Sequence, residues 1–365
     1  MTLKTIRPRR IACGLVIAAL LAVPQTARAQ AFAGMGADAD GFTMPQPAPR
    51  FAFPRDHGPH PDFRIEWWYV TANLKAADGK DYGLQWTLFR SALAPESASQ
   101  AAADWTSSQI WFCHAAVTGA DFHHANERYA RGGIGQAGVT AEPFAAWCDD
   151  WQMAGANLNK VRLNAAGPEF SYTLDLSSDA PLVRHGDSGF SVKSSSGQAS
   201  YYYSQPHYQA HGTLVVDGET LDVTGTAWLD REWASQPLAD NQTGWDWFSL
   251  NFDSGDKLMA FRLRQTDGDI FKSATWIDAQ GSHAQDGTAI QLTPLHTARV
   301  AGRKIPITWR LNLPDKALDV TIEALNPKAW MDLSIPYWEG PVTISGSHTG
   351  RGYLEMTGYA QNESR

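Results

Sequence analysis

The chain has 365 residues, a length that favours two domains of ordinary size, and a globular composition with 43% hydrophobic and 19% charged residues. Its 38 acidic residues outnumber 30 basic ones, which argues against nucleic acid or an anionic membrane surface as the main partner. It also contains 15 tryptophans, an unusually large number, and side chains of this size must fill cores, line a pocket, or do both.

Residues 1–29 have the organisation of a signal peptide. A basic stretch over 4–10 is followed by an apolar run over 11–23 and by Ala27-Arg28-Ala29, a small-x-small cleavage site. An apolar run of about 13 residues is too short to span a bilayer. We therefore expect cleavage near Ala29 and a periplasmic or secreted mature protein with no membrane-spanning segment. The arginines of the basic stretch leave Sec and twin-arginine export both open.

Cleavage would remove five basic residues and no acidic one, bringing the formal net charge from −8 to −13. It would also remove Cys13 and leave Cys113 and Cys148. Two cysteines in an oxidising compartment can form a disulfide. Their positions in the sequence leave the paired and the free forms both open.

After the leader, residues 30–50 are rich in Ala, Gly and Pro and predict a flexible N-terminal segment. From Phe51 onward, short alternating or aromatic runs are separated by turn sequences such as Asp78-Gly79 and Asp217-Gly218, which favour tight hairpins. The expected strands include 65–74, 82–90, 213–216 and 257–264. Closely spaced strands with tight turns predict an all-β fold, an antiparallel meander closed into a barrel or a sandwich.

A weak internal repeat divides this all-β region. Glu66-Trp67-Trp68 opens the first half and Asp246-Trp247-Phe248 opens the second, each before a turn and a strand that ends in arginine. The halves also close alike, on Val223–Ala227 and Met356–Ala360. Chance similarity between aromatic strands is the alternative. Agreement at both ends favours duplication, with an N-terminal domain over 51–233 and a C-terminal domain over 234–365.

Three motifs set acids or phenols among large aromatic side chains. They are Ile65-Glu66-Trp67-Trp68-Tyr69, Tyr201-Tyr202-Tyr203-Ser204, and Trp228-Leu229-Asp230-Arg231-Glu232-Trp233, with Gly244-Trp245-Asp246-Trp247 soon after the third. On a strand, residues two apart share a face, so Trp228, Asp230 and Glu232 point together and Arg231 points away. A carboxyl beside indole rings is poorly solvated, which raises its pKa and keeps it protonated. Aromatic faces also stabilise cations.

Structural roles compete with this interpretation. Aromatic residues that alternate on strands are mostly core, and Asp230-Arg231-Glu232 could be an ion-paired corner. His114, a lone histidine beside Cys113, is typical of a core position. Gly186-Asp187-Ser188-Gly189 matches the surroundings of a serine-protease nucleophile, but no histidine in a matching context precedes it. His207 and His211 have no third ligand spaced to join them, so we predict no metal. The sequence has no nucleotide-binding glycine loop, zincin helix or haem-attachment motif, so we also predict no cofactor.

At these motifs the sequence resembles the bacterial AttH-like proteins of the carotenoid 1,2-hydratase superfamily. The resemblance runs from about Phe51 to the C-terminus. It rests on Glu66-Trp67-Trp68-Tyr69, Cys113-His114-Ala115, Tyr201–Ser204, Gly225–Trp233, Gly244–Phe248 and Tyr337–Tyr359. It implies two tandem lipocalin-like antiparallel β-barrels with a pocket for a hydrophobic ligand. Characterised relatives hydrate an isoprenoid double bond without a cofactor, and the aspartate proposed as their proton donor matches Asp230. Trp228 stands where the hydratases have tyrosine, and their upstream His-x-Trp pair has no clear counterpart.

These observations give a hypothesis for the site and the function. The candidate catalytic residues are Asp230, Glu66 and His114. The candidate ligand-binding residues are Trp67, Trp68, Tyr69, Tyr201, Tyr203, Trp228, Trp233, Trp245 and Trp247. Asp230 would protonate an alkene, aromatic walls would shelter the cation, and water would add.

Two alternatives to catalysis remain open, a non-catalytic carrier of an isoprenoid or lipid-like ligand and a structural envelope protein. An open pocket with a buried acid favours the enzyme. A pocket without an acid favours the carrier, and filled barrels favour the structural protein. The oligomeric state stays open.

Overall fold

The computed structural model describes residues 39–95, 107–285 and 289–361. The predicted signal peptide and residues 30–38 of the predicted flexible segment lie outside these ranges. Within them, the regular elements are β-strands and two short 3-10 helices, η2 (Arg55–His57) and η4 (Pro314–Lys316), which confirms the all-β prediction. No helix in the described ranges is long and apolar enough to cross a membrane.

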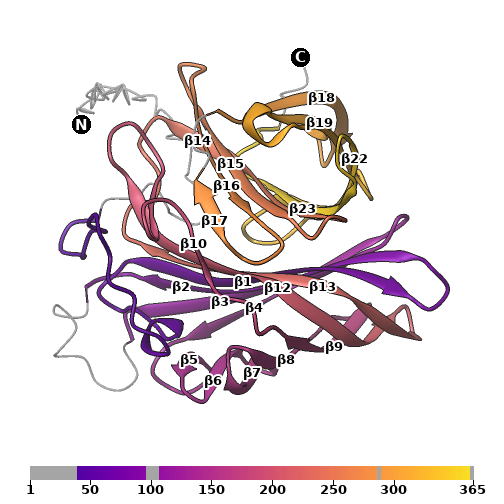
Figure 1. The fold of residues 1–365 in the computed structure, drawn as a ribbon. Helices are drawn as coiled ribbons and strands as arrows, with labels where there is room; N and C mark the ends of the chain where they lie inside the picture. Colours follow the sequence, from indigo (N-terminus) through magenta and orange to yellow (C-terminus); the bar gives the residue numbers. More distant parts are fainter. Residues whose placement is uncertain (1–38, 96–106, 286–288, 362–365) are drawn as a thin grey trace, which may run out of the picture. The chain divides into compact units, whose positions relative to one another are not determined.

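The first half of the chain forms a 13-stranded antiparallel sheet, drawn in indigo to pink in Figure 1. Its main path runs β4-β3-β2-β1-β13-β12-β9-β8-β7-β6-β5, and β10 and β11 pair with β12. The sheet curls over, so that β6 contacts β2, β3 and β4 from across the core. The strands are β1 (Ile65–Ala76), β2 (Asp81–Ala92), β3 (Gln109–Thr118), β4 (His123–Arg131), β5 (Ala137–Ala141), β6 (Phe144–Cys148), β7 (Trp151–Asn157), β8 (Lys160–Ala166), β9 (Phe170–Ser177), β10 (Val183–Arg184), β11 (Phe190–Val192), β12 (Ala199–Val216) and β13 (Glu219–Ala234).

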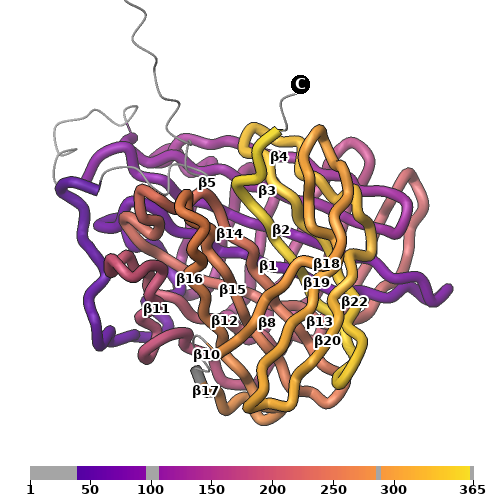
Figure 2. Tube along the Cα trace, turned by 90° about the horizontal axis from the view of Figure 1, so that it is seen from above, coloured from indigo at the N-terminus to yellow at the C-terminus, as the bar shows by residue number. Residues whose placement is uncertain are grey.

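The second half forms a ten-stranded antiparallel sheet with the order β17-β16-β15-β14-β23-β22-β20-β19-β18, and β21 pairs with β22. Figure 2 looks onto this sheet, whose orange and yellow strands lie in front of the indigo and magenta strands of the first. The strands are β14 (Gln242–Phe252), β15 (Lys257–Gln265), β16 (Ile270–Ile277), β17 (His283–Gln285), β18 (Gln291–Val300), β19 (Arg303–Leu313), β20 (Leu318–Ala324), β21 (Trp330–Met331), β22 (Tyr337–Gly346) and β23 (Gly350–Met356).

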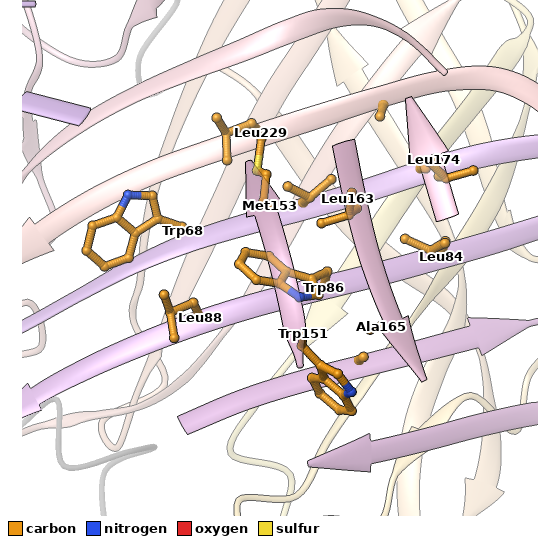
Figure 3. Close-up of a cluster of buried hydrophobic side chains, with 14 of the residues drawn as sticks. Trp68, Leu84, Trp86, Leu88, Trp151, Met153, Leu163, Ala165, Leu174 and Leu229 are labelled. Carbon is orange, nitrogen blue, oxygen red and sulfur yellow. The ribbon is translucent and has the colours of Figure 1, made fainter. Parts of the chain in front are cut away.

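Each sheet wraps a core of its own. In the first, Trp68, Trp86 and Trp151 pack with Met153 and Leu229 in a buried cluster to which the strands contribute alternate residues (Figure 3). In the second, residues from β14 to β23 form a separate cluster around Trp309 and Trp338. Many of the tryptophans therefore fill cores, as expected for side chains of this size.

The two cysteines that remain after the predicted leader lie in the first core. Cys113 on β3 and Cys148 on β6 are free and fully buried. Burial raises the pKa of the Cys113 thiol well above its usual range, and a hydrogen bond with Cys148 adds to the effect.

The sheets meet along β1 and β2, which contact β23 and β22. The approach is closest at Gly83 on β2, where a Cβ atom would come within 2.4 Å of Pro341 Cγ on β22. Between the sheets lies a third apolar cluster that includes Tyr69, Trp228 and Trp247. The chain passes from the first sheet to the second between Ala234 and Gln242.

The first strands of the two halves, β1 and β14, occupy equivalent positions in their sheets. β1 lies between β2 and the last strand of the first sheet, β13, and β14 lies between β15 and the last strand of the second, β23. Trp67 is paired with Glu232 on the last strand, and Trp247 is paired in the same way with Glu355. The two tryptophans that the internal repeat aligns therefore hold the same position in their sheets.

Candidate active site

A pocket of about 720 Å³, a volume that includes its open mouth, lies between the two sheets. Its walls are mainly apolar and come from both halves of the chain, with Trp67 and Phe89 from the first sheet and Trp247 and Phe261 from the second. The segment that joins the sheets closes one side with Pro237 and Leu238. Three carboxyl groups, those of Asp230, Glu232 and Glu355, lie among these mainly apolar walls.

Strand register brings these groups together. Trp67 is paired with Phe89 on one neighbouring strand and with Glu232 on the other. Trp247 is paired in the same way with Phe261 and Glu355. Each half of the chain therefore supplies an equivalent trio of tryptophan, phenylalanine and glutamate, and the two trios line one pocket.

Two of these acids, Asp230 and Glu232, belong to the first sheet, and Asp230 is the one without a basic side chain beside it among the residues described. The indole Nε1 of Trp228 donates a hydrogen bond to Asp230 Oδ1 at 2.7 Å, and the Ser204 hydroxyl donates to the same oxygen. Burial raises the pKa of Asp230 to about 7, although these hydrogen bonds favour the ionised form and oppose the rise. No ion pair reaches its carboxyl group from the described part of the chain. Asp230 is therefore substantially protonated near neutral pH.

Ser204 links Asp230 to a buried histidine. His185 Nε2 lies 2.6 Å from Ser204 Oγ, and His185 Nδ1 lies 3.0 Å from Thr275 Oγ1 on the second sheet. Because the Ser204 hydroxyl donates to Asp230, its oxygen must accept from His185, which places the imidazole proton on Nε2. This chain of hydrogen bonds holds the Asp230 carboxyl in one orientation.

A second poorly solvated carboxyl group faces the pocket from the other sheet. Trp245 Nε1 donates to Glu355 Oε1 at 2.6 Å, so an indole fixes this acid as Trp228 fixes Asp230. Burial raises the pKa of Glu355 to about 7, and the charges of Asp230 and Glu232 add to the rise. Behind it, Tyr69 donates to Glu339, whose pKa burial raises well above its usual range.

The third carboxyl group, that of Glu232, has its charge balanced by a neighbouring lysine. Glu232 forms an ion pair with Lys193 at 2.9 Å and accepts a hydrogen bond from Ser200. The Lys193 ammonium also lies over the rings of Tyr202 and Phe261, at 4.8 and 4.4 Å from their centroids. Glu232 and Lys193 therefore form a paired, charged part of the wall.

Of the residues singled out in the sequence, Asp230, Trp67, Tyr69, Trp245 and Trp247 line the pocket. Trp228 lies directly behind Asp230, to which it is hydrogen-bonded. The other predicted ligand-binding residues point to the opposite face of the first sheet. Trp68 belongs to the core, and Tyr201, Tyr203 and Trp233 pack around Phe51.

Two of the predicted catalytic residues do not line the pocket, although His114 lies directly behind its lining residues Phe89 and Tyr337. Glu66 is fully buried on the core side of β1, in ion pairs with Arg90 and Arg231. Burial would raise the pKa of Glu66, but the charges of the two guanidinium groups outweigh it and hold the pKa well below its usual range. His114 is buried with Nδ1 3.0 Å from the Tyr337 hydroxyl, and burial lowers its pKa to about 3.

The residues of this pocket that the sequence interpretation missed include Glu355, Tyr202 and Lys193. Tyr202 belongs to a motif that was recognised, but its neighbours Tyr201 and Tyr203 were chosen and lie on the other face of the strand. The internal repeat carried the signal for Glu355, because it aligns Trp67 with Trp247. No three His, Cys, Asp or Glu side chains within the described ranges cluster as metal ligands would.

Several solved structures share this architecture. A protein described as an AttH candidate from Nitrosomonas europaea is 34% identical, with a TM-score of 0.80 over 87% of this chain and 100% of its own. Kievitone hydratase from Nectria haematococca is 15% identical, with a TM-score of 0.66 over 88% of this chain and 96% of its own. CghA is 14% identical, with a TM-score of 0.52 over 89% of this chain and 98% of its own. At such identities the last two show the fold alone.

No curated protein matches the sequence at a significant level. The model of the AttH-like family matches residues 44–359, which span both sheets and every residue of the pocket. The chain belongs to the AttH-like family.

Proposed function

We propose that this protein is a cofactor-independent hydratase that adds water to a carbon–carbon double bond of a hydrophobic, isoprenoid-like molecule. The observation that carries the proposal is a carboxyl group without an ion-pair partner in the described ranges, Asp230, buried in an aromatic pocket between the sheets, where burial raises its pKa to about 7. The similarity in fold to kievitone hydratase fits this reaction class.

The geometry suggests how Asp230 would act. Ser204 and Trp228 both donate to Oδ1, and the Tyr202 hydroxyl is a third hydrogen-bond partner of the carboxyl group. With Oδ1 accepting two hydrogen bonds, the proton of the neutral acid lies on Oδ2. From there it would pass to the less substituted carbon of the alkene. The tertiary cation that forms would be stabilised by the faces of Trp67 and Trp247 and by the carboxylate left on Asp230. Addition of water and loss of its proton would then give the tertiary alcohol.

Asp230→Asn tests this role. The amide keeps the shape and the hydrogen bonds but carries no acidic proton, so hydration should fall by about 10²–10⁴-fold, the usual contribution of a general acid. The assay offers geraniol, 4-prenylphenol and squalene in ¹⁸O-water and follows incorporation of the label by mass spectrometry. For the wild type, the rate should decline as pH rises through about 7, where Asp230 ionises.

The same assay separates the enzyme from a carrier. A carrier would bind these alkenes, quench the fluorescence of the pocket tryptophans and return the alkenes unlabelled. Binding without labelled product in the wild type would therefore contradict the hydratase proposal and favour the carrier.

We also infer that the protein works outside the cytoplasm, because the first 29 residues have the organisation of a cleavable leader. N-terminal sequencing of protein recovered from the periplasm or medium should begin at Gln30. An intact Met1 on the recovered protein would contradict the inference.

A further inference from the structure

The pocket contains a second acid that the general-acid role of Asp230 leaves without a function. Glu355 lies on β23 of the second sheet, and Asp230 lies on β13 of the first. Both line the same pocket, and each is held by an indole N–H group, from Trp245 and Trp228 respectively. An alkene bound between the sheets would therefore have one carboxyl group on each side.

Hydration requires two proton transfers, one to carbon and one from the attacking water. If Asp230 delivers the first, a different group must accept the second while the Asp230 carboxylate faces the cation. Resting on the proposed function, we propose that Glu355 is the catalytic base that takes the proton from the water as it adds to the cation.

The three pocket carboxyl groups differ in their readiness to accept a proton. Glu232 is bound by Lys193 at 2.9 Å and by Ser200, and protonating it would break an ion pair. Glu355 accepts a hydrogen bond from a neutral indole and has no cation beside it among the described residues. The charge of an ionised Asp230 raises the pKa of Glu355, so ionisation of one of the two carboxyl groups disfavours ionisation of the other.

With Asp230 as acid and Glu355 as base, every proton and bond of the hydration is accounted for. The proton on Asp230 forms a C–H bond as the π bond breaks, and water oxygen forms the C–O bond. The water proton passes to the Glu355 carboxylate. The cycle then ends with Asp230 ionised and Glu355 protonated, and transfer of one proton from Glu355 to Asp230 restores the starting state. No oxidant, reductant or cofactor is needed.

Glu355 is also related to the internal repeat. It occupies on the last strand of the second sheet the position that Glu232 occupies on the last strand of the first. In the first half this glutamate is paired with a lysine, whereas in the second half its hydrogen-bond partners are neutral, the Trp245 indole and the Tyr69 hydroxyl. The two halves have thus diverged at one equivalent position, and only the second retains a carboxyl group free to accept a proton.

The test separates the two proton transfers with Glu355→Gln and Asp230→Asn in deuterium oxide. The full-length protein is given geraniol, 4-prenylphenol and squalene, and both alcohol formation and vinylic deuterium in the recovered alkene are measured. Without the base, Asp230 can still deuterate the alkene and the cation can return a proton, so Glu355→Gln should lose hydration by about 10²-fold or more and keep exchange. Asp230→Asn should lose both.

Further variants control for structure. Glu323→Gln removes an exposed glutamate from β20 of the same sheet and should retain both reactions. Glu355→Asp keeps a carboxylate and should recover part of the hydration, which a merely structural role would not predict. Thermal melts establish that each variant is folded.

The outcomes are distinct. If the wild type hydrates and exchanges none of the three alkenes, the proposed function fails and the role of Glu355 fails with it. If the wild type is active and Glu355→Gln hydrates at the wild-type rate, or loses exchange together with hydration while folded, the base assignment alone is wrong.

Discussion

Asp230 and Glu66 are buried carboxyl groups on neighbouring strands, and their surroundings give them opposite properties. Glu66 lies between Arg90 and Arg231 and is ionised. Asp230 has an indole and a hydroxyl beside it, and burial raises its pKa to about 7. The difference arises because Arg231, next to Asp230 in sequence, projects to the other face of β13 and pairs with Glu66.

Glu66→Gln should therefore destabilise the protein strongly. The change leaves two buried guanidinium groups without their shared carboxylate, and breaking a buried pair in this way costs about 3–5 kcal/mol. Denaturant unfolding of the purified variant measures the loss. Asp230→Asn is the matched control, since it makes the same chemical change one strand away and removes no ion pair. A Glu66→Gln protein as stable as the wild type would show that the network contributes little.

At the scale of the strand, alternation divides β13 between two environments. Trp228, Asp230 and Glu232 face the second sheet, and Leu229, Arg231 and Trp233 face the core of the first. The width of the pocket depends on the distance between this face of β13 and the second sheet. That distance is set where Gly83 on β2 lies beneath Pro341 on β22.

Gly83→Ala should disturb this contact. A Cβ atom there would overlap Pro341, and overpacking of this kind costs about 1–3 kcal/mol. The free energy of unfolding, obtained from a denaturant titration, measures the cost. Pro341→Ala in the same chain removes the ring that the new methyl group meets, so the double variant should recover part of the stability. Additive losses in the double-mutant cycle would contradict a direct clash.

At the scale of the whole molecule, the pocket makes stability depend on pH. Asp230 and Glu355 have folded-state pKa values raised to about 7, above those of an unfolded chain. Their contribution to stability is fully present below about pH 4 and is lost as the pH rises through about 7. Each unit of raised pKa corresponds to about 1.4 kcal/mol of folding free energy.

Asp230→Asn should therefore stabilise the protein relative to the wild type. The gain should grow as the pH rises from about 4 to 7 and level off above it, because the amide has no charge to bury. Denaturant unfolding of both proteins across this range measures the difference. A gain that shrinks with rising pH would mean that Asp230 is ionised and stabilised in the folded state.

The sequence alone determined much of the fold and part of the candidate site. The all-β fold, the likeness of the two openings, and the common face of Trp228 and Asp230 follow from turn residues and from the two-residue period of a strand, which are local properties of the chain. The tertiary structure decided which faces meet. Tyr202 rather than Tyr201 reaches the pocket, and Glu355 joins Asp230 from a strand 125 positions further along the chain. A register shift of one residue exchanges the faces of a strand, and pairing and sheet packing, which involve residues far apart in sequence, set that register.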